Sequence, residues 1–539
     1  MAKKVLSLTA VLLALAVTVL GEEALNYYAR GIAKYGKGDL DGALTDYNKA
    51  MELDPSLAEA YVGRGIVKEA KGNLDGALTD YNKAMELKPD LAEAYTGRGS
   101  TKAIKGDFDG ALTDYNKGIE LKPGLADSYV GRGGVKANKS DLDGALADFN
   151  KAIGLKSDWA DPYVGRGIVK ETKGDLDGAL ADFNKAIELK PDDAYAYIAY
   201  NNRGLTKRDK RDLDGALADY DKAIELKPDD AEAYCNRGLL KRTSGDLDAA
   251  LDDYSKAIKF KPDWAYAYMN RGSAKKAKGD LDGALADYNK AIELKPEDAS
   301  AYYDRGMAKF SAGDLDGALA DYGKAIELNP GFAPPYDHRG SLKKARGDAD
   351  GALADYNKAI ELNPKYARAY HSRGCLRYDA QDFAAALVDF RKEVELDSSL
   401  DYGHFRVWLI RARLGEKEPA NREFLAYLSN RKAGKPDDWE LQTARFLAGL
   451  FTEGEYLEAA ESADKTTESR QLCEAYFYAG TKQLIDGKKT QAKEYFEKCV
   501  ATGEKGGYEY ESAAAELKGL TSHLINTSSG EGTKKSETK

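Results

Sequence analysis

The sequence predicts an all-α solenoid of stacked helix pairs, and three observations support this prediction. Residues 26–400 repeat one 34-residue pattern eleven times. A turn signal stands in the middle of each copy, as in Gly72-Asn73. Most copies end on a proline, at Pro55, Pro89, Pro123, Pro191, Pro228, Pro262, Pro296, Pro330 and Pro364, with Ser157 and Ser398 in its place twice. A fixed period of this length indicates units that bury their apolar faces only against their neighbours.

The copy that begins at Ala58 shows how each element is predicted. With Ala58 as position 1, we expect a first helix (helix A) at positions 1–14 and a second (helix B) at positions 17–30. Position 16 is usually Asp, an N-cap acceptor for helix B, and the acid at position 18 favours the positive end of its dipole. Glycine at position 15 turns the chain, and proline at position 32 stops helix B.

The recurring Asp-x-Asp-Gly, as in Asp39 to Gly42, also invites a calcium-loop interpretation. A calcium loop of the EF type needs glycine at its sixth position and a distal Glu. Here the glycine comes fourth and the helix begins at once, so helix capping is the better explanation.

The pattern resembles the tetratricopeptide repeat (TPR). The small and aromatic positions of that family are met by Tyr61, Gly65, Ala77, Tyr81, Ala84 and Pro89, and equivalents recur in most copies. The resemblance is strong over residues 24–400 and weak over residues 401–524. It implies a right-handed α-α superhelix, and it says more about fold than about function.

Two positions depart from the general TPR pattern. Position 7 is Arg and position 23 is Asp in every copy, as in Arg64 and Asp80. If Gly65 packs against Ala77, antiparallel helices bring positions 7 and 23 close together. We therefore predict a ladder of Arg–carboxylate pairs, for which a planar guanidinium is well suited. The alternative is an anion-binding stripe of arginines.

The resemblance further implies that helix A positions 2, 5, 9, 12 and 13 line a concave groove that receives a peptide. This groove is apolar with a few acids in early copies, basic at position 12 in later copies, and aromatic near the end. The predicted protein-binding residues are Tyr28, Ile32, Val62, Ile66, Glu69, Val130, Val164, Ile168, Glu171, Arg208, Arg242, Lys276, Tyr303, Phe310, Lys344, His371 and Tyr378. The basic residues favour an acidic partner segment, unless position 12 is simply a solvated face.

The first 21 residues differ from the rest of the chain. Lys3 and Lys4 precede an apolar run from Val5 to Leu20, and Gly21 follows. This pattern predicts a secretory signal peptide at residues 1–21, because the run is short for a membrane-spanning helix. We expect an exported protein, periplasmic or secreted. The alternative is a membrane anchor that remains uncleaved.

After the repeats at residues 22–400, the period weakens over residues 401–524. Helix pairs are expected at 407–414 with 420–432, at 439–451 with 455–465, and at 471–486 with 489–502. A single helix at 508–521 is expected to cover the exposed end of the array, as terminal caps do. We expect residues 525–539 to be disordered because they are polar and small. The stretch 473–478 resembles C-terminal modules of exported bacterial TPR proteins.

Cys473 and Cys499 occupy positions 1 and 27 of the last helix pair, so they are expected to face each other. An oxidising compartment would permit a disulfide between them. The alternative is that they are two small residues at packing sites. Cys235 and Cys375 lie four repeats apart and are expected to remain unpaired.

Composition and motifs argue against several classes of function. The chain has 539 residues, with 80 basic and 90 acidic side chains and a net charge of −10. This acidic balance with interspersed signs argues against a nucleic-acid binder. No nucleophile motif, phosphate loop or zinc spacing is present. His338, His371 and His404 fall at different helix positions, so we expect no shared metal and no cofactor.

We therefore expect an exported, non-enzymatic scaffold or adaptor whose groove binds peptide segments of partner proteins, with no small-molecule substrate. Membrane contact is expected only if the leader is uncleaved. The alternative function is a self-assembling structural component of the cell envelope.

Overall fold

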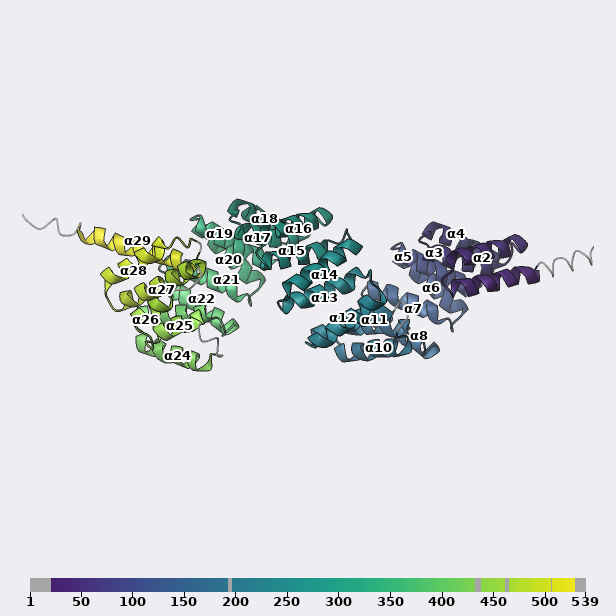
Figure 1. Ribbon diagram of the computed structural model, residues 1–539, viewed down its shortest axis with the longest axis horizontal. Coiled ribbons are helices and arrows are strands. Elements are labelled where there is room, and N and C mark those ends of the chain that lie inside the picture. Colours follow the sequence, from purple (N-terminus) through teal and green to yellow (C-terminus); the bar gives the residue numbers. More distant parts are fainter. Residues whose placement is uncertain (1–20, 192–195, 432–437, 461–464, 506, 529–539) are drawn as a thin grey trace, which may run out of the picture. The chain divides into compact units, whose positions relative to one another are not determined.

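The computed structural model describes residues 21–191, 196–431, 438–460, 465–505 and 507–528. Within these ranges the chain is helical and has no β-strand, as predicted (Figure 1). It divides into two compact units, Met1–Asp263 (unit 1) and Trp264–Lys539 (unit 2). The predicted signal peptide lies outside the described residues except for Gly21. No helix in the described part is long and apolar enough to cross a membrane.

Unit 1 is a stack of helix pairs. Residues 21–35 form its first described helix. The helices that follow are α2 (Leu40–Leu53), α3 (Ala58–Ala70), α4 (Leu74–Leu87), α5 (Ala92–Ile104), α6 (Phe108–Leu121), α7 (Ala126–Asn138), α8 (Leu142–Leu155), α9 (Asp161–Thr172), α10 (Leu176–Leu189), α11 (Ala196–Asp209), α12 (Leu213–Leu226), α13 (Ala231–Thr243) and α14 (Leu247–Phe260).

Unit 2 continues the pattern and then adds the weaker pairs. Its helices are α15 (Ala265–Ala277), α16 (Leu281–Leu294), α17 (Ala299–Ser311), α18 (Leu315–Leu328), α19 (Ala333–Ala345), α20 (Ala349–Leu362), α21 (Ala367–Asp379), α22 (Phe383–Leu396), α23 (Asp401–Arg413), α24 (Lys417–Asn430), α25 (Trp439–Leu447), α26 (Glu453–Ala459), α27 (Lys465–Ile485), α28 (Lys489–Ala501) and α29 (Tyr508–Ser528).

The turn between the two helices of a repeat forms as the sequence predicts. Helix A ends where position 15 adopts a left-handed conformation, for example Gly72 at φ +78°. Ser140, Arg211 and Gln381 adopt the same conformation without being glycine. The next residue caps helix B: the Asp39 carboxylate accepts a hydrogen bond from the Gly42 amide at 2.9 Å. Capping therefore accounts for the Asp-x-Asp-Gly pattern.

Aromatic rings at position 24 fill the space between successive repeats. The Tyr81 ring is almost fully buried and lies between α3 and α5. A Cβ added at Gly65 would be 2.8 Å from this ring, and one added at Gly97 would be 2.4 Å from it. Glycine at positions 6 and 8 thus lets the helices approach a large side chain, since protein interiors leave no spare volume. This ring, rather than Ala77 alone, is what Gly65 packs against.

The end of the chain forms the three predicted weaker pairs and a last helix. The last helix, α29, packs on α28, as expected of a cap, and also on α27 and α21. The contact with α21 was not predicted from the sequence. Residues 525–528 belong to α29, so the predicted disorder starts too early. Residues 529–539 lie outside the described part.

Candidate functional site

The predicted Arg–Asp ladder is present. In the second repeat, Arg64 Nε donates to Asp80 Oδ2 at 2.8 Å and Arg64 Nη2 donates to Asp80 Oδ1 at 2.6 Å. Arg30 donates a single hydrogen bond to Asp46, from Nη2 at 3.0 Å. The two-bond pairing recurs in Arg98–Asp114, Arg132–Asp148, Arg166–Asp182, Arg203–Asp219, Arg237–Asp253, Arg271–Asp287, Arg305–Asp321, Arg339–Asp355 and Arg373–Asp389. The Asp80 side chain is only 2% exposed.

Three further groups complete this rung of the ladder. Lys68 Nζ lies 2.8 Å from Asp80 Oδ2. Arg64 Nη1 donates to Asn48 of the preceding repeat at 2.8 Å, and the guanidinium lies over the Tyr61 ring. Lys at position 11 and Asn at position 25 also recur in the sequence, so a signal for both contacts was available. Because these arginines are bound within the protein, the anion-binding alternative is wrong.

Helix A lines the inner side of unit 1. Each helix A packs on the helix A of the next repeat (α3 on α5, α5 on α7, α7 on α9). On this side the predicted groove residues Ile32, Ile66 and Ile168, all at position 9, are 49%, 38% and 38% exposed. Val62 is buried, and Tyr28, Val130 and Val164 pack against buried clusters. Among these predicted groove residues, position 9 therefore supplies the accessible apolar side chains.

The charged residues predicted for the groove of unit 1 differ in their exposure and in the contacts that they already make within the protein. Glu69 accepts hydrogen bonds from Ser100 at 2.9 Å and from Thr101, and Glu171 accepts one from Thr206 at 2.9 Å. These two acids join successive A helices. Arg208 pairs with the adjacent Asp209, and its side chain is 30% exposed. Arg242 is also partly exposed.

In unit 2, the predicted residues of α15 and α17 remain accessible. Lys276 and Tyr303 are half-buried, and Phe310 is 44% exposed. The Tyr303 ring packs edge-on against Phe332 and His338. Burial, and after it the charge of Arg368, lowers the pKa of His338 to about 3. This histidine is therefore a neutral packing residue at ordinary pH.

Helix α29 covers the other predicted residues of unit 2. Lys344 Nζ lies 2.7 Å from Glu511 Oε2, and its side chain is 8% exposed. The Tyr378 hydroxyl donates to Glu516 at 3.1 Å, and the His371 ring packs edge-on against Tyr508. The prediction that Lys344, His371 and Tyr378 line an open groove is therefore wrong, because the chain's own last helix occupies that place.

Two arginines that sequence analysis missed hold α29. Arg406 is completely buried, and its Nη2 lies 3.1 Å from Glu509 while its Nη1 donates to Ser512 at 3.2 Å. Arg413 Nη2 donates to Glu516 at 3.0 Å. Arg406 follows Phe405 in an apolar run, so a burial signal was present. Nothing local indicated its partner.

The two cysteines of the last pair face each other as predicted. Cys473 Sγ and Cys499 Sγ are 3.1 Å apart, and both are buried free thiols. The contact with Cys473, followed by burial, raises the pKa of Cys499. The disulfide itself stays a prediction. Cys235 and Cys375 are also free, as expected.

His371 and His404, like these cysteines, contact other side chains of the protein. His371 Nδ1 lies 3.0 Å from both carboxylate oxygens of Glu393. His404 stacks on the Tyr427 ring. Among the described residues, no group of three or more His, Cys, Asp or Glu side chains is arranged to hold a metal ion.

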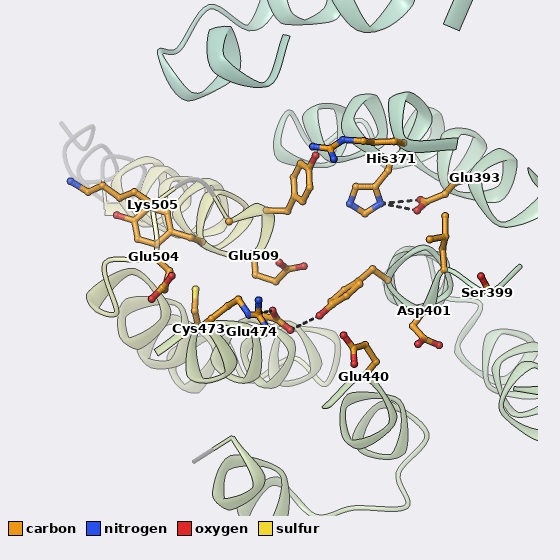
Figure 2. Close-up of a pocket in the computed structure, with 17 residues that line it drawn as sticks. His371, Glu393, Ser399, Asp401, Glu440, Cys473, Glu474, Glu504, Lys505 and Glu509 are labelled. Atoms are coloured by element: carbon orange, nitrogen blue, oxygen red, sulfur yellow. Dashed lines mark hydrogen bonds and ion pairs between the residues drawn. The ribbon is translucent and has the colours of Figure 1, made fainter. Parts of the chain in front are cut away.

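A cavity of about 860 Å³ lies beside α29 in unit 2 (Figure 2). Its walls come from α21, α22, α23, α25, α27 and α29, and they carry six carboxylates. These are Glu393, Asp401, Glu440, Glu474, Glu504 and Glu509. Tyr402, Tyr508 and Tyr510 add aromatic surface. The cavity is within the size range of ligand sites. It could not be predicted from the sequence because its walls are distant in the chain.

Comparison with protein families matches repeat models over most of the array. The model described as TPR repeat matches residues 31–72, 69–103, 204–243, 272–313 and 340–381. Two models described as tetratricopeptide repeat match residues 231–263 and 299–332, and residues 92–124 and 160–193. A comparison with curated proteins finds no match.

Solved structures that resemble the chain include several repeat proteins. Yeast Tom70 is 18% identical, covers 76% of this chain and 99% of its own, and has a TM-score of 0.40. MamA is 31% identical, covers 31% of this chain and 96% of its own, and has a TM-score of 0.28. YrrB, described as a TPR protein with an unusual peptide-binding site, is 29% identical, covers 35% and 97%, and has a TM-score of 0.30.

Proposed function

Because this chain belongs to the tetratricopeptide repeat family, whose members are protein–protein interaction scaffolds, we propose that it is an exported, non-enzymatic adaptor. In this proposal the inner surface of unit 1 binds an extended segment of a partner protein. The segment has apolar side chains that contact α3 to α9 and acidic side chains that reach Arg208 and Arg242.

The observation that carries this proposal is the exposure of apolar side chains at position 9. Ile66 and Ile168 remain 38% exposed on helices whose other apolar residues are mostly buried, and Ile32 is 49% exposed on the first helix, where Leu25 and Tyr35 are exposed as well. Ile104, at position 13 of α5, is 59% exposed. Apolar side chains along one face can contact the apolar side chains of an extended peptide. Arg208 and Arg242 supply charge complementarity to the acidic side chains of that peptide.

Selection of random displayed peptides on residues 22–539 tests this proposal. We expect the selected peptides to be enriched in apolar and acidic residues. Ile66→Glu should abolish their binding, because it places a charge in the apolar contact. Arg208→Glu with Arg242→Glu should weaken binding and reduce its dependence on salt.

Leu155→Glu is the matched control, because Leu155 is also 38% exposed but ends a helix B. It should leave peptide binding unchanged. Equal loss in Leu155→Glu and Ile66→Glu, or no enrichment of peptides, would contradict the adaptor proposal. If the chain instead associates with itself in a concentration-dependent manner, the structural-component alternative is favoured, and analytical ultracentrifugation measures this directly.

Export rests on the leader pattern of residues 1–21. Expression of the full chain followed by cell fractionation and intact mass measurement tests it. A mature chain that begins at Glu22 outside the cytoplasm is the expected result. A full-length chain that stays with the membrane would support the anchor alternative.

A further inference from the structure

The cavity of unit 2 is lined by more acidic than basic side chains. Six carboxylates line it, against Arg368, Arg470, Lys505 and His371. Arg368 and Arg470 stand at its edge, with side chains 51% and 66% exposed, whereas the buried His371 is paired with Glu393. The Glu474 side chain is only 9% exposed. The inner wall is therefore the acidic part.

Three of these carboxylates are already neutralised by cations of the protein. Glu393 binds His371, and Glu509 binds Arg406 at 3.1 Å. Asp401 accepts two hydrogen bonds from Arg431, at 2.8 Å and 2.7 Å. These three acids have a structural role and need no ligand.

Glu474 and Glu440 differ from these three. Glu474 accepts hydrogen bonds from two neutral donors, Trp439 Nε1 at 2.6 Å and the Tyr402 hydroxyl at 2.8 Å. Its nearest cation is Arg470, at 3.9 Å on the solvent side, which exceeds hydrogen-bond length. Figure 2 shows Glu474, Glu440 and Glu509 on three helices around the same space.

Burying an ionised carboxylate costs free energy unless a cation is hydrogen-bonded to it. In the absence of a ligand, the ionised form of Glu474 is therefore unfavourable. Burial, followed by the charge of Glu509, raises the pKa of Glu474 to about 7. Burial also raises the pKa of Glu440, which lies beside Asp438. A positive group placed between them would favour the ionised form of both. The Tyr402 ring adds a surface suited to a cation.

We propose that this cavity binds an alkylammonium group, as carried by a lysine side chain or a free polyamine, between Glu474 and Glu440 and against Tyr402. An ammonium has three donors, and the two carboxylates have acceptor positions left for them. This site is separate from the inner surface of unit 1, so the proposal does not depend on peptide binding there.

Calorimetric titration of residues 22–539 tests the proposal with two probes. Acetyl-lysine amide stands for a peptide side chain, and spermidine stands for a free polyamine. Acetyl-norleucine amide is the uncharged match. We expect one or both ammonium probes to bind and the norleucine probe not to bind. The tighter probe identifies the source of the ammonium group.

Glu474→Gln and Glu440→Gln should each weaken binding about tenfold, the effect of losing one charge-assisted hydrogen bond. Glu361→Gln removes the same charge from an exposed position of α20 and should change nothing. Circular dichroism of each variant verifies folding, and Glu440→Gln remains informative if Glu474→Gln unfolds. Absence of binding by both ammonium probes, or equal weakening by Glu361→Gln, would overturn the proposal.

Discussion

Lys344 and Glu511 form an ion pair between a repeat helix and the last helix of the chain, with 2.7 Å between Lys344 Nζ and Glu511 Oε2. Asp379 Oδ2 lies at the same distance from Lys344 Nζ, 2.7 Å. Burial alone would lower the pKa of Lys344, but the charges of Asp379 and Glu511 raise it above its ordinary value. The acidic segment that binds this position-12 lysine belongs to the same chain and not to a partner protein.

This pair predicts that Lys344→Met strongly weakens the attachment of α29. The substitution leaves two carboxylates without their shared cation, and breaking a buried pair costs about 3 kcal/mol or more. Hydrogen exchange should show faster exchange of α29 and α21 while unit 1 is unchanged. Lys358→Met, on the exposed side of α20, is the control, and equal exchange in both variants would contradict the role of the pair.

The ladder predicts that two aspartates of the same repeat contribute differently to the free energy of unfolding. Asp80 is buried and holds Arg64 and Lys68, whereas Asp75 is 87% exposed and holds only Lys105. Asp80→Asn should destabilise its repeat by about 3 kcal/mol, because the buried cations lose their charged partner. Asp75→Asn should have little effect. Urea unfolding followed by circular dichroism distinguishes them, and similar midpoints would refute the difference.

Replacing either of two glycines of helix A by alanine is predicted to change stability, with opposite sign at the two positions. Gly97→Ala places a methyl group against the buried Tyr81 ring and should destabilise the protein by about 1–3 kcal/mol. A Cβ at Gly134 meets nothing within 4 Å. Gly134→Ala should therefore stabilise α7 by up to about 1 kcal/mol, because alanine favours the helix. Thermal unfolding measures both, and destabilisation by Gly134→Ala would count against this account of the packing.

Glu474 predicts a pH dependence of stability. Its pKa is about 7 in the folded protein and about 4.5 when unfolded, so the folded state holds more protons between these values. Stability should therefore fall as pH rises from 4.5 to 7, by about 3 kcal/mol. The facing groups are Glu509 on α29, Tyr402 on α23, Trp439 on α25 and Arg470 on α27.

The variant Glu474→Gln isolates this effect from other titrations. The difference in unfolding free energy between the variant and the parent chain should grow from pH 4.5 to pH 7 in favour of the variant. A constant difference over this range would mean that Glu474 ionises normally.

The repeats could be predicted from the sequence because their contacts are local and periodic. Counting positions along two antiparallel helices brought Arg64 and Asp80 together, and the structure confirms the pair. The same counting placed Cys473 beside Cys499. Each inference needed only the geometry of one helix pair.

The placement of α29 could not be predicted in this way. Its amphipathic pattern indicates a helix with a buried face, but several exposed faces of the array could receive that face. The choice depends on Arg406, Arg413 and Lys344, which meet Glu509, Glu516 and Glu511 only in the folded chain. The cavity forms only when α29 is in this place, so it could not be predicted from the sequence either.

The rung that joins Arg64 to Asp80 in its own repeat and to Asn48 in the preceding one has a consequence for how the gene can change. Most joints of this kind in unit 1 present the same donors and acceptors, as in Arg98 to Asn82 and Arg132 to Asn116. A duplication of one whole 34-residue segment therefore creates a new joint whose polar groups are all matched. An insertion between an Arg and its Asp would separate the pair, whereas Arg203 and Asn184 are 19 residues apart instead of 16 and still form their hydrogen bond. Unequal recombination in register can lengthen or shorten such an array, whereas length changes between an Arg and its Asp are selected against.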